Sequence, residues 1–257
     1  MNVNRLYKYR DLYQDRLKYV ERIFTHQEVY FSRPLDFNDP FDCLPKFTLE
    51  ASEDELKSYI VDRFPKIYPN LNRHERRTQI KSLLKTKRFS DPELVLKLES
   101  AHRVKIQEQT GVFCLSAAPD HILMWSHYTM AHTGICIEFE ATSSTEFFGI
   151  AQQVHYQKDY PLLNIIRDSA DEILTKALLT KADFWDYEKE WRISWKDTGP
   201  GIYKYPDGLL KGVIFGARIS APDKALVLSW IDKMTIKPSL YQATLKSIEY
   251  GLDIIPL

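Results

Sequence analysis

The segment WDYEKEWRIS, residues 185–194, places Glu188, Glu190 and Arg192 on alternate positions between large apolar residues. Successive side chains of a β-strand point to opposite faces, so a strand here gathers the two carboxylates and the guanidinium on one face. The other face then carries Trp191, Ile193 and Trp195. The pattern predicts a strand with one buried face, and its polar face is either a solvated set of ion pairs or a site for chemistry.

Other aromatic and β-branched runs predict further strands. They are RLYKYR (5–10), VYFSRP (29–34), GVFCLS (111–116), ICIEFE (135–140), IAQQVHY (150–156), KGVIFG (211–216) and SIEYGLDIIP (247–256). Helical spacing predicts helices within 11–27, 117–134, 168–182 and 222–235. Because the strands mostly do not alternate one for one with helices, we expect an α+β fold with a mixed or antiparallel sheet.

The composition is that of a folded protein. The chain has 257 residues, is 44% hydrophobic, and carries 35 basic and 35 acidic residues, so its net charge is zero. A neutral chain has no global attraction for polyanions or acidic membranes, so any such site has to be local. Three widely spaced cysteines, together with the lack of an apolar leader or span, predict a cytoplasmic protein without a membrane partner. We expect residues 1–257 to form a single domain.

Residues 52–109 differ from the rest of the chain. Three charged amphipathic patterns predict three helices, which form a helical insertion or subdomain. The most basic stretch lies inside it and contains Arg73, His74, Arg76, Arg77, Lys81, Lys85, Lys87 and Arg88. Such a stretch faces nucleic acid or a phosphate, or is simply a solvated helix face. The neighbouring acidic helices favour the solvated face.

Two further segments carry polar residues among aromatic ones. In PLDFNDPFD, residues 34–42, Asp39-Pro40 predicts a turn that Phe37 and Phe41 hold against the core, with a direct catalytic role for Asn38 or Asp39 as the alternative. In the helix predicted within 117–134, a stripe is formed by Trp125, Tyr128 and His132. This stripe lines a pocket or packs in the core.

Several familiar chemistries have no motif here. The sequence contains neither GxxxxGK[ST] nor GxGxxG, which argues against a P-loop or a Rossmann phosphate site. His121, His127 and His132 do not have the HExxH spacing, and no CxxC pair accompanies them. We therefore expect no metal. Cys114 or Ser116 paired with a histidine stays open as a nucleophile, although neither lies in a GxSxG elbow.

Six motifs resemble a widespread bacterial and phage-associated family catalogued as a domain of unknown function. The motifs are LYKYR, YFSRPLDFNDPFD, FCLS, LMWSHYTMAHTGICIEF, VHY and YEKEWRI. The resemblance runs over nearly the whole chain and implies no reaction.

A second resemblance does imply a reaction. An arginine ending an early strand, a serine ending a middle strand and a Glu-x-Glu at the start of a later strand are similar to the R-S-E order of ADP-ribosyltransferases. On this resemblance Arg10 is the arginine, Ser116 is the serine, and Glu188 and Glu190 are the Glu-x-Glu. It implies an ADP-ribosyltransferase-like fold around a cleft, NAD as co-substrate, and a protein or nucleic acid as acceptor. A toxin or an antiphage defence effector would fit that activity.

The resemblance also assigns roles to these residues. Cleavage of the nicotinamide glycosidic bond develops an oxocarbenium-like sugar, which a fixed carboxylate near the ribose stabilises. Glu190 is expected in that role, and Glu188 is expected to orient or deprotonate the acceptor.

Four residues are expected to bind the dinucleotide. Arg10 would hold its phosphates or ribose, Ser116 would brace the site, and Trp125 or Tyr128 would stack on a flat ring. The Ser-Thr-Ser of the resembled enzymes is Ser-Ala-Ala at 116–118 in this chain, which removes two hydroxyl groups.

Three alternatives stay open at the level of the sequence. Arg192 could neutralise Glu190 as a plain ion pair. The protein could be a noncatalytic defence module that binds a ligand or partner through the same residues. It could also be a metal-dependent nucleic-acid enzyme that uses Glu138, Glu188 and Glu190, because carboxylates are the ligands that hard cations prefer.

Overall fold

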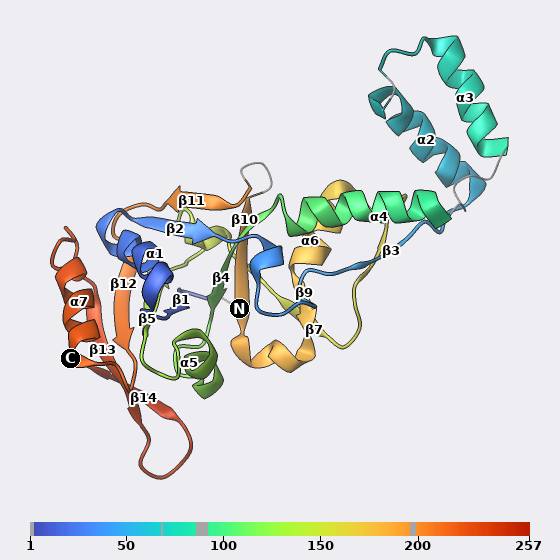
Figure 1. Cartoon of the computed structure of the whole chain (residues 1–257). Helices are drawn as coiled ribbons and strands as arrows, with labels where there is room; N and C mark the ends of the chain where they lie inside the picture. Colours follow the sequence, from blue (N-terminus) through green and yellow to red (C-terminus); the bar gives the residue numbers. More distant parts are fainter. Residues whose placement is uncertain (1–2, 68, 86–91, 196–198) are drawn as a thin grey trace.

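Strand β10 (Glu190–Trp195) forms over most of the strand that the opening segment predicts, next to one edge of an eight-stranded sheet. A computed structural model describes residues 3–67, 69–85, 92–195 and 199–257 of the chain (Figure 1). The order of strands across the sheet is β14, β13, β12, β5, β1, β4, β10 and β6. The β12–β13 pair is parallel among antiparallel neighbours, so the sheet is mixed and the predicted α+β class is confirmed.

Five of the remaining sheet strands form at or within three residues of their predicted positions. They are β1 (Arg5–Arg10), β4 (Gly111–Ser116), β5 (Ile135–Glu140), β6 (Gln152–Gln153) and β12 (Leu210–Phe215). The C-terminal hairpin of β13 (Ser239–Leu245) and β14 (Leu252–Pro256) completes the sheet. No strand was predicted over β13.

Short strand pairs lie beside the main sheet. The pairs are β2 (Glu28–Phe31) with β11 (Gly201–Lys204), β3 (Lys46–Thr48) with β8 (Leu162–Asn164), and β7 (His155–Gln157) with β9 (Thr180–Ala182). The first pair is antiparallel and the other two are parallel.

One face of the sheet carries the largest apolar cluster. Strand residues such as Leu6, Phe113 and Ile193 meet helices α1 (Gln14–Thr25) and α7 (Ala221–Ile231) there. Phe24 of α1 and Trp230 of α7 stack with ring centroids 5.9 Å apart. Buried apolar area is the main stabilising contribution of this face.

Helix α5 (Ile122–Tyr128) covers the opposite face. Its Met124 and Trp125 are buried against Tyr9, Cys136 and Ile214 of the sheet. A third cluster joins α4 (Pro92–Gln107) and α6 (Ala170–Leu178) to β4 and β8.

The predicted insertion contains the three helices expected there. They are α2 (Glu53–Ile67), α3 (Arg73–Lys85) and α4, and Figure 1 shows α2 and α3 standing apart from the sheet. Lys87 and Arg88 of the predicted basic stretch lie outside the described residues.

Two local predictions were wrong. Glu188 was expected on the strand, but it ends the 3₁₀ helix η4 (Asp183–Glu188), and Lys189 then adopts a left-handed conformation with φ of 44°. The strand therefore starts at Glu190. Phe41 was expected to hold the Asp39-Pro40 turn against the core, but it is 61% exposed. Phe37 does pack against the third apolar cluster, which joins α4 and α6 to the sheet. The Asp39 carboxylate accepts the Phe41 N–H at 2.9 Å, and this hydrogen bond closes the turn.

Candidate functional site: a buried cluster of five charges

Five charged side chains from four parts of the chain meet at the polar face of β10. They are Asp42, Lys181, Glu188, Glu190 and Arg192, and all of them are buried. Asp42 comes from the turn before β3, Lys181 from β9, Glu188 from the end of η4, and the last two from β10. Buried charges destabilise the fold unless they are paired and hydrogen-bonded, so the stability of this site depends on the contacts among the five side chains.

Arg192 is the most buried member and binds two carboxylates at once. Its Nε and Nη2 donate to the two oxygens of Glu190 at 2.8 and 2.9 Å. Its Nη1 and Nη2 donate to the two oxygens of Asp42 at 3.0 and 2.6 Å. Nη1 also donates to the carbonyl of Leu178 at the end of α6, at 2.7 Å. These paired contacts fix the guanidinium, and they also fix both carboxylates.

Lys181 bridges the same carboxylates to Glu188. Its Nζ lies 2.5 Å from Glu188 Oε2, 3.0 Å from Glu190 Oε2 and 3.5 Å from Asp42 Oδ2. Burial by itself lowers the pKa of Lys181, but the three carboxylates outweigh burial and raise it above its ordinary value. Lys181 is therefore a permanent cation at the centre of the cluster.

The cluster has one carboxylate more than it has cations. Two cations face Asp42, Glu188 and Glu190, so full ionisation would leave one negative charge in a buried site. Burial alone would raise the pKa of Glu190, but Arg192 and Lys181 hold it well below its usual range. For Glu188, burial is the largest effect and raises the pKa, the charge of Glu190 adds to it, and the contact with Lys181 only partly offsets them. Of the two glutamates, Glu188 is therefore the one that takes up a proton more readily.

The local backbone explains why Glu188 reaches a site centred on β10. The left-handed Lys189 reverses the chain between η4 and β10, so that Glu188 and Glu190 both turn toward Lys181. The hydroxyl of Ser116 donates to the backbone carbonyl of Glu188 at 2.6 Å and accepts the N–H of Ala118 at 3.0 Å. Ser116 also lies directly opposite Glu190 in the β4–β10 register. The serine thus positions the backbone of both glutamates.

Two tyrosines complete the hydrogen bonding. The hydroxyl of Tyr128, at the end of α5, donates to Glu188 Oε1 at 2.5 Å. The hydroxyl of Tyr156 in β7 accepts the backbone N–H of Glu190 at 2.8 Å. Tyr128 is half-buried whereas Glu188 is 3% exposed, so Tyr128 separates the carboxyl group from solvent. Burial followed by the charge of Glu188 raises the pKa of Tyr128, which keeps it a hydrogen-bond donor.

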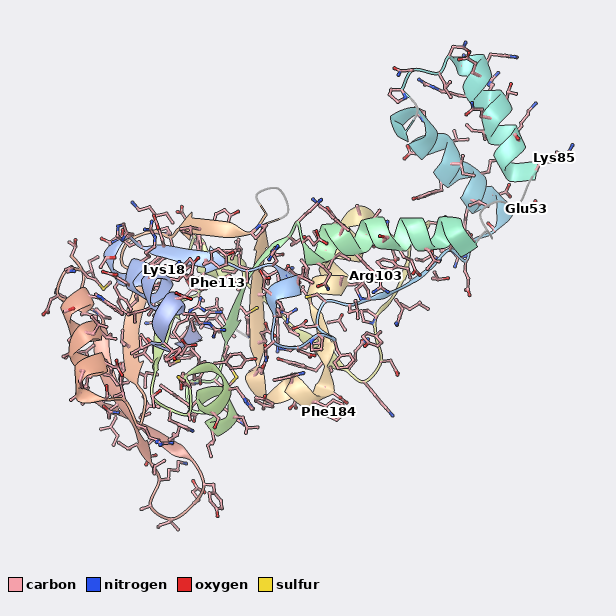
Figure 2. The ribbon with its side chains drawn as sticks, viewed as in Figure 1. Lys18, Glu53, Lys85, Arg103, Phe113 and Phe184 are labelled. Carbon is pink, nitrogen blue, oxygen red and sulfur yellow. The ribbon has the colours of Figure 1, made fainter. Side chains whose placement is uncertain are left out.

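Aromatic rings surround this side of the cluster. The ring centroid of Trp185 lies 5.0 Å from Lys181 Nζ. The ring of Tyr187 contacts that of Trp185 and also stacks on His121, with the Tyr187 and His121 ring centroids 5.0 Å apart. Phe184, labelled in Figure 2, is 85% exposed beside them. The Nδ1 atom of His121 is buried without a hydrogen-bond partner. Partly exposed rings next to a charged group suit a flat, polar ligand.

Of the residues predicted to bind the dinucleotide, Ser116 and Tyr128 contact Glu188, but Arg10 does not reach the cluster. Tyr7 lies opposite Ser116 in the β1–β4 register, so it shares the face of Glu190. Arg10 is an odd number of residues from Tyr7 and points to the other face. Lys8, which shares that other face, lies over the ring of Phe113 at 4.7 Å. Phe113 belongs to the core on the side of α1 and α7.

Trp125 is fully buried, which removes it as a surface for ligand stacking. Its Nε1 donates to the carbonyl of Pro119 at 2.9 Å, and its ring meets Tyr9 edge to face at 5.3 Å. In the predicted stripe, Trp125 is therefore core and only Tyr128 borders the site.

Sequence reasoning missed Asp42 and Lys181. The turn motif drew attention to Asn38 and Asp39, which lie four and three residues before Asp42. Lys181 lies in ALLTKADFW, where a single cation stands among mostly apolar residues. A lysine that closely follows an apolar run is a signal for a buried ion pair, because a lone charge is rarely buried.

Cations occupy the positions around these carboxylates that a metal ion would need. Within the described ranges, no group of three or more His, Cys, Asp or Glu side chains is arranged to hold a metal. Glu138 lies three strands from Glu190 in the same cross-strand row and pairs with Arg5 at 3.0 Å. The geometry thus does not bring together the three glutamates of the metal-dependent alternative.

Most residues of the cluster lie in a segment of the chain that matches a family model. Residues 124–193 match the family Protein of unknown function (DUF2971). This match confirms the predicted resemblance to a domain of unknown function over residues 124–193, whereas the motifs LYKYR, YFSRPLDFNDPFD and FCLS lie outside the matched segment. The DUF2971 segment contains Tyr128, Lys181, Glu188, Glu190 and Arg192, whereas Asp42 and Ser116 come from outside it. A search of curated proteins and a search of solved structures each found no match. Across the described residues, no helix has both the length and the apolar character needed to span a membrane.

Proposed function

We propose that this protein is an ADP-ribosyltransferase-like enzyme that cleaves the glycosidic bond of NAD, with Glu188 as its reacting carboxylate. The observation that carries the proposal is the surplus carboxyl group of the buried cluster. Glu188 has a raised pKa, borders Tyr128 and adjoins partly exposed aromatic rings. Enzymes place acids and bases in such sites, where burial and neighbouring charges tune the pKa.

The two glutamates take different parts in this chemistry. When the bond between the ribose and nicotinamide breaks, nicotinamide leaves with the electron pair and the sugar becomes cationic. The acceptor, water or a hydroxyl group, attacks the sugar carbon and passes its proton to the ionised Glu188. Glu190 is saturated by Arg192 and Lys181, so it holds the lysine and stays ionised. Glu188 thus keeps the role that the sequence resemblance implies, whereas Glu190 holds the lysine instead of acting on the sugar.

The strand arrangement supports the resemblance without Arg10 as a contact. Arg10, Ser116 and Glu190 lie on β1, β4 and β10, which are neighbours in the sheet in that order. Ser116 has the bracing role through its hydrogen bond to the Glu188 carbonyl. The flat ring of NAD would stack on Tyr187 or Trp185 in place of Trp125.

The test is the release of nicotinamide from NAD, measured by chromatography without added metal. Glu188→Gln is expected to lower the rate by about two orders of magnitude or more, as when a positioned acid or base is removed. Asp186→Asn is the matched control, since Asp186 is an exposed carboxylate of the same 3₁₀ helix. Equal rates for all three proteins, or no release by the wild type, would overturn the proposal.

One observation favours a noncatalytic ligand-binding module instead. Both oxygens of Glu188 already have partners, Lys181 and Tyr128, so a ligand has to displace one of them. Calorimetry with NAD separates the two functions. Binding that Glu188→Gln leaves intact, with no nicotinamide released by the wild type, would support the binding module.

A further inference from the structure

Helices α2 and α3 form an arm that extends away from the sheet (Figure 1). They contact each other, and none of their side chains that the structure describes belongs to the three apolar clusters of the rest of the protein, which we call the body. The base of the arm is fixed by Glu55 of α2, whose two carboxylate oxygens accept from Arg167 at 2.9 and 3.0 Å. The arm thus presents most of its surface to the surroundings rather than to the body.

The start of α3 is set by a complete capping arrangement. The side chain of Asn72 accepts the N–H groups of His74 and Glu75, and the Glu75 carboxylate accepts the N–H of Asn72 at 2.8 Å. This pattern satisfies backbone donors that a helix start leaves open. It fixes where the helix begins, and so the helical phase of every residue that follows.

That phase aligns four cations in one stripe. Arg73, Arg77, Lys81 and Lys85 follow each other at intervals of four residues, and all four are exposed. Residues four apart are neighbours on a helix surface, each about 6 Å further along the axis. Figure 2 labels Lys85, whose side chain points away from α2. We name these four residues the basic stripe.

The basic stripe is not neutralised by the protein. In the part of the chain that the structure describes, none of its four residues forms an ion pair. Helix α3 as a whole carries five Arg or Lys residues against one carboxylate, Glu75. Like charges at this spacing repel and destabilise an isolated helix. A row of unpaired cations on a projecting helix is therefore a cost to the fold, which an anionic partner would relieve.

We infer that the basic stripe binds the phosphate backbone of a nucleic acid. A nucleic-acid strand presents a regular row of negative charges, which a row of cations that winds gradually around the helix complements along its length. The residues beside the stripe, Thr78 and Gln79, are polar and exposed, and hydroxyl and amide groups are common phosphate contacts. An interfacial membrane helix would instead need a broad apolar face opposite its cations, with large apolar residues to insert. The inference is independent of the NAD chemistry.

The experiment is fluorescence anisotropy with labelled oligonucleotides of mixed sequence, one single-stranded and one duplex, in DNA and in RNA. The test protein carries Arg77→Gln with Lys81→Gln. The control carries Lys158→Gln with Lys233→Gln, which removes the same charge from exposed sites on the body. Helical circular dichroism checks the fold, and it is expected to stay unchanged because glutamine, lysine and arginine have similar helix propensities.

The wild type is expected to bind with an affinity that falls steeply between about 50 and 200 mM salt. The Arg77/Lys81 variant should bind about tenfold more weakly at low salt. Its salt slope for duplex should be shallower by about two, because each of the two cations neutralises one phosphate in the wild type. The Lys158/Lys233 control should match the wild type.

Three results would overturn the inference. They are no binding of any oligonucleotide at low salt, equal weakening in the control, and capture of acidic lipid vesicles through the stripe without capture of oligonucleotides. Which oligonucleotide binds most tightly identifies the kind of strand.

Discussion

At the scale of single residues, the two glutamates of YEKEWRI differ in their partners. Glu190 has Arg192 on both oxygens and Lys181 on one, whereas Glu188 shares Lys181 and otherwise depends on a neutral tyrosine. Two glutamates that are two residues apart thus behave differently, because Glu190 is a fixed anion and Glu188 is a titratable group. This difference arises from position rather than from residue type.

The first prediction compares the glutamine variants of these residues. Glu190→Gln should lower the free energy of unfolding at neutral pH by about 3–5 kcal/mol, because it leaves Arg192 and Lys181 short of a buried counter-charge. Glu188→Gln should change it by less than about 1 kcal/mol, because a neutral amide resembles the protonated acid and removes the surplus charge. Urea denaturation of both variants and the wild type measures the difference. A greater loss for Glu188→Gln would contradict this ranking.

The second prediction concerns pH. The pKa of Glu188 is higher in the folded than in the unfolded protein, so its stabilising effect is full below the unfolded pKa and is lost as pH rises through the folded pKa. Glu188→Gln lacks this titration. The stability of the wild type relative to the variant should therefore fall as pH rises through that range and level off above it. Urea denaturation across the acidic to neutral range tests this, and a constant difference at all pH values would be the contrary result.

Among the elements, the turn before β3 is connected to β10 by the ion pair between Asp42 and Arg192. Both carboxylate oxygens of Asp42 accept hydrogen bonds from the guanidinium of Arg192. The ring centroid of Phe37, in the same segment as Asp42, lies 5.5 Å from the guanidinium carbon. The ion pair joins residues 150 positions apart in the chain.

The third prediction tests that connection with a double-mutant cycle. Asp42→Asn should destabilise the protein by about 3–5 kcal/mol, and Arg192→Met should do so by a similar amount, because each leaves buried charge unpaired. The double variant should lose clearly less than the sum, since direct contacts couple. Losses that add would show that the two residues act independently.

Most elements could be predicted from local patterns, but not how they meet. The strands at 5–10, 111–116 and 135–140 follow from aromatic and β-branched runs, and the strand at 190–195 follows from apolar alternation. The displacement of Glu188 from the strand could not be predicted, because a lysine in the left-handed region has no sequence signature of the kind that glycine provides.

The candidate site was predicted only in part, for a related reason. Its two glutamates share one motif, but Asp42 and Lys181 join them through tertiary contacts. The opposite orientation of Arg10 follows from strand register, which depends on the neighbouring strand as much as on β1 itself.

At the scale of the whole molecule, the body and the arm have separate parts in this account. The charged cluster contains no residue of α2 or α3, and the basic stripe contains no residue of the body. The Glu55–Arg167 pair between them is partly exposed, with side-chain exposures of 42% and 52%. Pairs of this kind contribute little to stability.

The fourth prediction follows from this separation. Replacing residues 53–85 by a flexible Gly/Ser linker should shift the melting temperature of the body by no more than about 2–4 °C, which corresponds to roughly 1 kcal/mol in a domain of this size. The shortened protein should keep its NAD cleavage and lose its oligonucleotide binding. Loss of the cooperative melting transition would show that the arm is part of the core.

Of the two glutamates in the cluster, Glu188 takes up a proton while Glu190 stays ionised. The most direct test is a pH titration of the side-chain carboxyl carbons by ¹³C NMR, with the two signals assigned by their absence from Glu188→Gln and Glu190→Gln. We predict that Glu188 titrates above the ordinary glutamate value, and that Glu190 shows no protonation down to the lowest pH at which the protein stays folded. A Glu188 signal that titrates at or below the ordinary value would contradict the account.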